Sequence, residues 1–153
     1  MKNTPNKNFR AGVGAVILND SGKVLGLERK DIPGAWQLPQ GGLKDETPLE
    51  GVKREIFEET GIRARGLQLL SECSRLLVYE LPPEARTQKI GRGQVQYWFL
   101  FRFTGKEKAI TLGDQKEFSA WKWMSMKKLA KKVVSFKQPV YRELVKEFKD
   151  YLK

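Results

Sequence analysis

Residues 41–62 read Gly41-Gly42-Leu43-Lys44-Asp45-Glu46-Thr47-Pro48-Leu49-Glu50-Gly51-Val52-Lys53-Arg54-Glu55-Ile56-Phe57-Glu58-Glu59-Thr60-Gly61-Ile62. The stretch predicts a glycine loop that leads into a short helix. Thr47 suits the N-cap, and Pro48 suits the first helical position, where a missing N–H costs nothing. Glu50 follows Thr47 at the spacing of a capping box, and Gly61 stands where a left-handed C-terminal cap belongs. Both ends of this helix are therefore encoded in the local sequence.

The predicted helix has an apolar stripe and an acidic stripe, because residues three and four apart share a face. The apolar stripe, which we expect to pack on a core, consists of Leu49, Val52 and Ile56. The acidic stripe consists of Glu55, Glu58 and Glu59. Three carboxylates this close repel one another unless a cation lies among them.

Such an acidic cluster has two interpretations: a solvated face or a metal site. Here the cluster follows a Gly-Gly pair in a chain of net charge +11, and both helix caps are present. Mg²⁺ takes carboxylate oxygens and shares itself with substrate phosphates. We therefore interpret the helix as a platform for Mg²⁺, or for Mn²⁺ in its place, that serves phosphate chemistry.

Composition excludes several classes of site. The chain has no histidine, which removes Ser-His and Cys-His catalysis and His-ligated zinc. The single cysteine, Cys73, excludes an intrachain disulfide and a multi-cysteine zinc site. No apolar run is long enough to span a bilayer, and the polar N-terminus lacks the apolar core of a signal peptide. We expect one domain over residues 1–153, in the cytoplasm, with no membrane partner.

The charge balance points to the kind of partner. Lys and Arg number 29 against 18 Asp and Glu, and the pI is about 9.8. A basic surface suits a polyanionic partner, nucleic acid first. The alternative is that the charge serves only general solubility.

Apolar alternation, turn residues and caps predict the remaining elements. Strands are expected over residues 11–18, 23–29, 67–81, 94–103 and 120–124, and a short extended piece over residues 36–39. Helices are expected over residues 126–132 and 139–152, joined by a linker at 133–138. The order of these elements predicts an α/β fold in which helices cover a mixed sheet.

The helix stretch resembles the signature box of the Nudix hydrolases. That box is a Gly, five residues, a Glu, seven residues, and then Arg-Glu-aliphatic-x-Glu-Glu-x-Gly-aliphatic. The matching positions are Glu46, Arg54, Glu55, Ile56, Glu58, Glu59, Gly61 and Ile62. Four residues rather than five separate Gly41 from Glu46, so the predicted loop is one residue short. The resemblance implies the α/β/α sandwich of that family, with a mixed sheet between helices.

Further segments resemble the bacterial RNA pyrophosphohydrolases, which overlap with the dinucleoside polyphosphate hydrolases. They are residues 9–10, 36–42, 77–82, 93–99, 117–123 and 133–137. Enzymes of the RNA branch remove pyrophosphate from the 5′-triphosphate end of RNA, leave a monophosphate and so open a transcript to decay. The resemblance implies this activity, with an RNA 5′ end or a nucleotide polyphosphate as substrate and a homodimer as the expected assembly.

Two alternative functions stay open. One is a Nudix enzyme that hydrolyses a dinucleoside polyphosphate or a nucleoside triphosphate, because the box serves those reactions equally. The other is a non-catalytic RNA-binding module, which an incomplete box would favour. The box is complete, so the sequence favours an enzyme.

Hydrolysis of a phosphoanhydride needs neutralised phosphate oxygens and an aligned water, and metal ions supply both. The expected ligands are Glu55, Glu58 and Glu59, with a backbone carbonyl of residues 40–42. Glu117 matches a further metal-binding or base position of the family, and whether Glu58 or Glu117 takes the proton stays open. Arg54 is expected to orient the acidic cluster by pairing with it; the alternative is a surface pair that contributes little.

The residues expected to bind the substrate lie outside the helix. They are Arg10, Arg29, Gly41, Gly42, Tyr79, Phe136 and Lys137. The resemblance gives the two arginines contacts to phosphate, and guanidinium forks suit phosphate oxygens. Tyr79 would donate to a phosphate, while Phe136 would stack on a base beside the charge of Lys137. The alternatives are a Phe136 packed in the core and a solvated Arg29.

Overall fold

The computed structural model describes residues 7–113 and 117–153, which form an eight-stranded sheet and three α-helices. The strands are β1 (Phe9–Leu18), β2 (Val24–Arg29), β3 (Trp36–Gln37), β4 (Gln40–Gly42), β5 (Leu67–Glu72), β6 (Leu77–Glu80), β7 (Gly93–Phe103) and β8 (Phe118–Met124). The helices are α1 (Pro48–Thr60), α2 (Met126–Lys132) and α3 (Gln138–Glu147). Short 3₁₀ turns are η1 (Ala64–Gly66), η2 (Pro83–Ala85), η3 (Glu107–Ala109) and η4 (Ser135–Lys137).

The sheet is mixed, as predicted. β1 and β7 run parallel along the whole of β1, from the pair Phe9–Gly93 to the pair Leu18–Arg102. The other pairings within the described residues are antiparallel. The strand order is β3-β2-β1-β7-β5, while β4 pairs with β1, β6 with β7 and β8 with β2.

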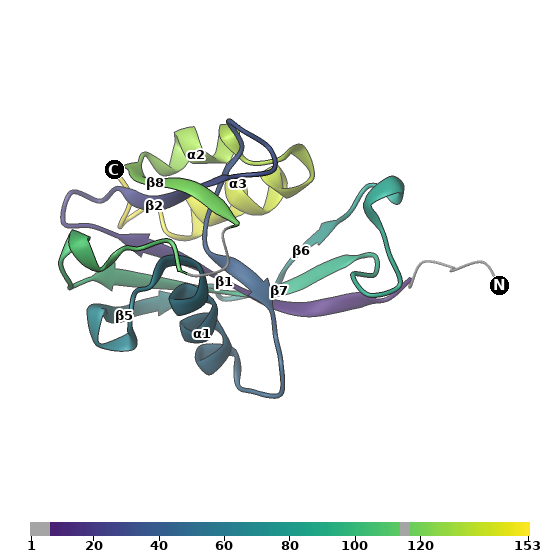
Figure 1. Ribbon diagram of the computed structural model, residues 1–153, viewed down its shortest axis with the longest axis horizontal. Helices are drawn as coiled ribbons and strands as arrows, with labels where there is room; N and C mark the ends of the chain where they lie inside the picture. The colour runs from purple at the N-terminus through teal and green to yellow at the C-terminus, as the bar shows by residue number, and fades with distance from the viewer. Residues whose placement is uncertain (1–6, 114–116) are drawn as a thin grey trace.

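Helices cover both faces of this sheet, so the expected α/β/α layering is confirmed (Figure 1). Side chains alternate between faces along a strand. The face under α1 receives Val13, Ala15 and Ile17 from β1, with Phe99, Phe101 and Phe103 from β7. The opposite face receives Val16, Leu18, Trp98 and Leu100, and α2 and α3 pack there. In Figure 1, β6 and the adjoining ends of β1 and β7 extend beyond the helix-covered part.

Helix α1 begins and ends where the sequence predicts. The Thr47 hydroxyl accepts a hydrogen bond from the Glu50 N–H, and Gly61 forms a left-handed cap with φ of 77°. The second half of the capping box differs, because the Glu50 carboxylate accepts from the Thr47 hydroxyl and not from its backbone N–H. Val52 and Ile56 are fully buried, so the predicted apolar stripe packs on the core.

The strand predicted over residues 67–81 is wrong in one respect, since the chain forms two strands, β5 and β6. Both pair with β7, with Glu72 opposite Phe99 and Leu77 opposite Gln96. Residues 73–76 of the outer chain therefore lie opposite only residues 97–98 of β7, which leaves two residues too many for a continuous ladder. The Ser74 N–H bonds the Glu147 carboxylate at 2.8 Å and not β7. A bond to a distant element therefore interrupts the ladder, and local alternation carries no signal of it.

Two further boundaries differ from prediction. The predicted glycine loop begins with a strand, because Gln40–Gly42 pairs with Gly12–Gly14 of β1. Helix α3 ends at Glu147 rather than at Leu152, and a turn then brings the Lys153 N–H to the Gly22 carbonyl at 3.1 Å. Within the described residues no helix has the length and apolarity that a membrane crossing requires.

Tyr141 ties α3 to the chain that leads into β4. Its hydroxyl is buried and accepts a hydrogen bond from the Leu38 N–H at 2.8 Å. Its ring also packs edge-on against Trp98, with centroids 6.0 Å apart. The hydrogen bond to Leu38 therefore holds the residues just before β4 (Gln40–Gly42) against α3.

We expect Tyr141→Phe to lower the free energy of unfolding by about 1–3 kcal/mol, because the buried Leu38 N–H loses its acceptor. Urea denaturation followed by circular dichroism measures the change. Tyr151→Phe is the matched control, since Tyr151 is 41% exposed. Equal unfolding midpoints for the two variants would contradict this role of Tyr141.

Candidate active site

The acidic stripe of α1 faces β4. Glu59 is 4% exposed and accepts a hydrogen bond from the Gln40 N–H at 2.8 Å. The side chains of Glu55 and Glu58 are 12% and 27% exposed. Exposure therefore increases from Glu59 to Glu55 to Glu58 along the side of α1 that faces β4.

Arg54 joins the acidic residues into one network. Its guanidinium grips Glu46 with two nitrogens, the closest contact being 2.6 Å. A third nitrogen donates to Glu55 at 2.8 Å and to Glu58 at 3.2 Å. The guanidinium also donates to the Gly42 carbonyl at 2.9 Å. Arg54 is thus a multivalent clamp, and a lone surface ion pair does not describe it.

The two glycines make room for charged side chains. A Cβ on Gly41 would lie 2.1–2.3 Å from the carboxylate of Glu55. A Cβ on Gly42 would lie 2.6 Å from a guanidinium nitrogen of Arg10. Contacts this short do not occur in real proteins, so a side chain at either position would push the charged group away.

Burial and mutual repulsion act on the acidic groups together. Burial raises the pKa of Glu59 well above its ordinary value, and the charges of Glu55 and Glu117 raise it further. Burial is also the main cause that raises the pKa of Glu55; Arg54 opposes it, while Glu58 and Glu117 add to it. The predicted ligands are therefore close enough to interact electrostatically, although they come from α1 and from the residue before β8.

These carboxylates fit a hard divalent cation by their chemistry, because oxygen ligands of negative charge are what Mg²⁺ and Mn²⁺ prefer. Among residues 7–113 and 117–153 no three acidic groups are gathered around one point for an ion. Arg54 donates to one oxygen each of Glu55 and Glu58, and the Gln40 N–H donates to one oxygen of Glu59. The second carboxylate oxygen of each residue accepts no hydrogen bond from the described residues, so it is available to an ion.

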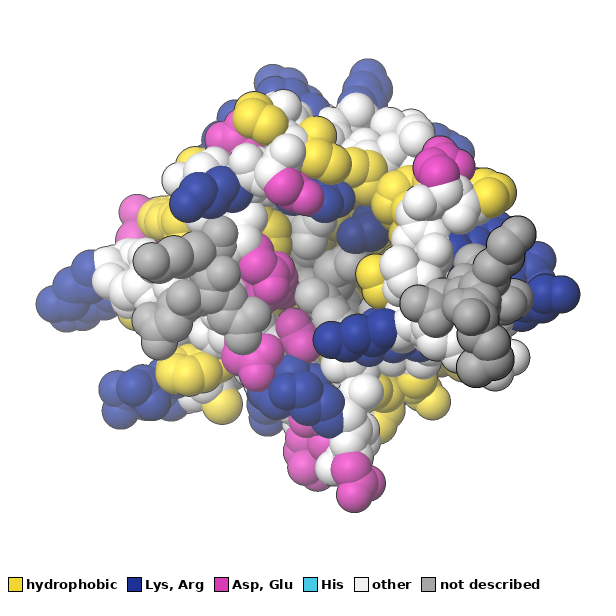
Figure 2. Space-filling view, turned by 45° about the vertical axis from the view of Figure 1, so that its right-hand side comes forward, with side chains coloured by type: hydrophobic (Ala, Val, Ile, Leu, Met, Phe, Trp, Pro, Cys, Tyr) yellow, Lys and Arg dark blue, Asp and Glu magenta, His cyan; other side chains and the backbone are white. Residues whose placement is uncertain are grey.

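A hollow of about 570 Å³ adjoins the buried acid. Its lining comprises Arg29, Lys30, Asp31, Gln37, Gln40, Glu59, Glu117, Phe118 and Lys137. Figure 2 shows the molecule hollowed on this side, with acidic side chains on one flank and Lys and Arg around the others. The predicted metal ligands Glu59 and Glu117 thus share a hollow with Arg29 and Lys137.

Lys137 is a buried cation without an anionic partner. It is 7% exposed, and its ammonium forms no hydrogen bond or ion pair with any residue in 7–113 or 117–153. It lies over the rings of Tyr79 and Phe136, 5.4 Å and 6.0 Å from their centroids. Burial lowers its pKa to about 8, and the charge of Arg29 acts in the same direction.

The other predicted substrate residues differ in how free they are. Arg29 already binds Asp31 through two nitrogens, at 3.0 Å and 2.7 Å. Tyr79 is 8% exposed and packs against Phe136 with centroids 5.7 Å apart. Phe136 is half-buried against the core, so it combines features of both interpretations offered for it. Arg10 lies against Gly42 at the start of β1.

Several polar residues of the hollow were missed by the sequence analysis. Gln37 and Gln40 are both at least nine-tenths buried, and Gln40 Oε1 has no hydrogen-bond partner among the described residues. Lys30 and Asp31 line the same space, and the Lys30 N–H donates to the Glu117 carbonyl at 2.9 Å. Two glutamines within a short apolar strand segment were the available signal for the first pair.

Comparison with known proteins identifies the family. Residues 8–144 match the NUDIX domain. The RNA pyrophosphohydrolase of Zymomonas mobilis is 41% identical over 149 residues, which is 94% of this chain and 96% of that protein. Nudix hydrolase 26 of Arabidopsis thaliana is 39% identical over 160 residues, which is 97% of this chain and 73% of that protein.

Solved structures agree as well. The E. coli dihydroneopterin triphosphate pyrophosphohydrolase superposes with a TM-score of 0.72 at 25% identity, over 91% of this chain and 98% of that chain. The chain belongs to the Nudix family, and the resemblance of residues 41–62 to the signature box is confirmed.

The Arg54–Glu46 contact predicts a pH dependence of stability. Hydrogen bonds from Arg54 lower the pKa of Glu46 to about 2. Between this value and the ordinary value near 4.5 the unfolded chain binds more protons, so this contribution is complete above about pH 4.5 and is lost as the pH falls toward 2. We expect the difference in unfolding free energy between the wild type and Glu46→Gln to shrink as the pH falls through this range.

Urea unfolding at several pH values between about 3 and 6 measures this difference through the linkage relation. Glu84→Gln is the control, because Glu84 is exposed and forms no ion pair within the described residues. A difference that stays constant with pH would show that Glu46 does not titrate in this window.

Proposed function

We propose that this chain is a divalent-metal-dependent hydrolase that removes pyrophosphate from the 5′-triphosphate end of RNA and leaves a 5′-monophosphate, which starts decay of the transcript. The observation that carries the proposal is that buried Glu59 and buried, unpaired Lys137 line one hollow. A metal ion and a phosphate group together supply the charges that these two residues lack. The identity to relatives named RNA pyrophosphohydrolase supports RNA as the source of that phosphate.

The metal would be held by Glu55, Glu58, Glu59 and Glu117, and Mg²⁺ or Mn²⁺ suits these oxygens. When bound, such an ion polarises a phosphoryl oxygen and acidifies a water molecule. Arg54 keeps the α1 carboxylates in place through Glu46 and the Gly42 carbonyl. Glu58 or Glu117 accepts the proton of the attacking water; Glu58 is the more exposed of the α1 ligands.

The substrate side of the hollow is basic and aromatic. Lys137, with its unpaired ammonium, contributes charge to a phosphate group, and a bound phosphate would favour its protonated form. Arg29 and Arg10 offer further guanidinium donors, although Arg29 must share itself with Asp31. Phe136 stacks with the base at the 5′ end, and the ring of Tyr79 packs against the ring of Phe136.

A small-molecule substrate is the second candidate. The hollow of about 570 Å³ falls within the size range of pockets that enclose small ligands. A dinucleoside polyphosphate or a nucleoside triphosphate presents the same phosphoanhydride to the same carboxylates. The two candidates differ only in what extends from the first nucleotide.

We further propose that residues 1–153 act as one Nudix domain in the cytoplasm, in keeping with the single cysteine. The homodimer implied by the family resemblance stays a prediction.

A competition assay tests the substrate. The protein is given Mg²⁺ with equal amounts of 5′-triphosphorylated RNA and a dinucleoside tetraphosphate, and the products are quantified over time. We expect monophosphorylated RNA to form at least about tenfold faster, which corresponds to roughly 1.4 kcal/mol of preference. Faster cleavage of the dinucleotide would make this a nucleotide-clearing enzyme.

The metal-centred chemistry is tested at Glu58. We expect Glu58→Gln to lower turnover by at least about 100-fold, because even outer-shell partners of a metal contribute 10–100-fold. Glu50→Gln is the control on the same helix, since Glu50 is exposed and lies outside the acidic stripe. The shift of melting temperature with Mg²⁺ gives a second readout. A Glu58→Gln enzyme with full turnover would exclude the proposed role.

A further inference from the structure

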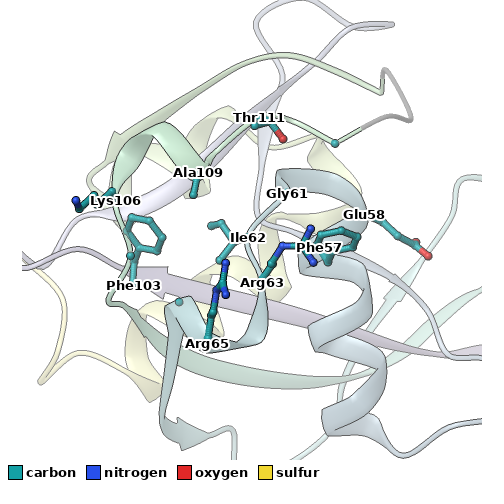
Figure 3. Close-up of a pocket in the computed structure, with 13 residues that line it drawn as sticks. Phe57, Glu58, Gly61, Ile62, Arg63, Arg65, Phe103, Lys106, Ala109 and Thr111 are labelled. Atoms are coloured by element: carbon teal, nitrogen blue, oxygen red, sulfur yellow. The ribbon is translucent and has the colours of Figure 1, made fainter.

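A second hollow, of about 630 Å³, lies at the C-terminal end of α1. Figure 3 shows Ile62, Arg65, Phe103 and Ala109 around this space, with Lys106 and Glu58 at its two edges and their side chains directed outward. Its lining includes Phe57, Ile62, Arg63, Arg65, Phe103 and Lys106. Glu58 also lines it, so the second hollow begins at a residue of the candidate active site. Glu58, Gly61 and Ile62 of the signature box line it as well, but the sequence analysis assigned no role to its cations Arg63, Arg65 and Lys106.

Three cations of this hollow are free of anionic partners. The side chains of Arg63, Arg65 and Lys106 form no hydrogen bond or ion pair with other residues of 7–113 and 117–153. Six other arginines, Arg29, Arg54, Arg75, Arg86, Arg92 and Arg102, each contact a carboxylate, whereas Arg10 and Arg142 have no ion pair among the described residues either. Glu58 is the one acidic residue among the described lining residues. The hollow is therefore a local excess of positive charge.

An aromatic surface stands beside these cations. The ring of Phe57 is 44% exposed, so one side of it is accessible from the solvent. The guanidinium of Arg63 lies over this ring, 5.1 Å from its centroid. A paired ring and guanidinium form a flat platform on which a nucleobase can stack, and neighbouring cations can contact its phosphate.

The walls of the hollow are held by main-chain contacts. The Thr111 N–H donates to the Thr60 carbonyl at 2.9 Å, and the Gly61 N–H donates to the Phe57 carbonyl at 2.9 Å. These bonds satisfy two carbonyls in the last turn of α1, the end of the helix that carries partial negative charge. The Thr104 N–H bonds the Gly66 carbonyl at 2.9 Å and joins the far wall. The concave shape thus exists before any ligand binds.

We infer that this second hollow binds a downstream nucleotide of the RNA whose 5′ end lies at the α1 carboxylates, with the base on Phe57 and the phosphates on Arg63, Arg65 and Lys106. This inference rests on the proposed function for the source of the nucleotide. It adds a reason for the enzyme to prefer an RNA chain over a free nucleotide, because only a chain reaches both hollows.

The test compares two triple variants that each remove three positive charges. One is Arg63→Gln/Arg65→Gln/Lys106→Gln, and the control is Lys127→Gln/Lys131→Gln/Arg142→Gln, whose residues are exposed on α2 and α3. Turnover with Mg²⁺ is measured on a 5′-triphosphorylated 12-nucleotide RNA and on a 5′-triphosphorylated dinucleotide. Fluorescence anisotropy in EDTA measures binding of a 5′-hydroxyl RNA of the same length.

We expect the first variant to raise KM for the long RNA at least about tenfold, to leave the dinucleotide within about twofold, and to reduce the salt dependence of RNA binding by about two in slope. The control should change each quantity by less than about threefold, since distant charges act only through screened fields. Equal losses on both substrates, or equal losses in both variants, would overturn the inference. If the wild type hydrolyses neither RNA, the proposed function fails, while anisotropy with 5′-hydroxyl RNA still decides whether the hollow binds RNA.

Substitutions at Phe57 distinguish a nucleotide-binding site from a site that binds any anion. We expect Phe57→Leu to weaken binding of the 5′-hydroxyl RNA about tenfold, whereas Phe57→Tyr, which keeps the ring, should bind like the wild type. A poly-glutamate peptide is the competing ligand. If it binds as tightly as the RNA and the Phe57→Leu change has no effect, the hollow is a site for acidic protein segments and the nucleotide assignment is wrong.

Discussion

The Arg54 guanidinium is the contact on which the acidic site depends. It reaches Glu46 in the chain before α1, Glu55 and Glu58 on α1, and the carbonyl of Gly42 at the end of β4. Charge-assisted hydrogen bonds of this kind are the strong ones, and a guanidinium can serve several acceptors because its donors lie in a fixed plane. One side chain therefore sets the spacing between helix, strand and loop. A lysine, which is a point charge, would not bridge the same partners.

The sheet determines what lies around that contact. The parallel pairing of β1 with β7 and the antiparallel pairing of β1 with β4 bring Arg10, Gly41 and Gly42 beside α1. Tyr141 fixes the entry to β4 from the opposite layer. Helices from both layers therefore hold β4 in place. As a result, its three residues lie beside Glu59, Glu55 and Arg54 of α1.

The two buried charges of the first hollow are each held in an unfavourable state. Burial raises the pKa of Glu59 and lowers that of Lys137 to about 8, so burial disfavours the charged form of each. They influence each other, yet they form no ion pair within 4.0 Å. Glu59 lacks a cation as partner and Lys137 lacks an anion. A ligand that carries both signs of charge, as a metal–phosphate complex does, would supply both.

The sequence by itself determined α1, its caps, its apolar stripe and the family, because these rest on interactions between residues close in the chain. It also determined the mixed α/β architecture through the periods of its strands and helices. It did not determine the break between β5 and β6, since the Ser74–Glu147 bond joins distant segments. The pairing of β4, the isolation of Lys137 and the free cations at Arg63, Arg65 and Lys106 were likewise decided by tertiary structure. Whether a charge finds a partner depends on which remote elements the fold places beside it, and local patterns carry no record of that.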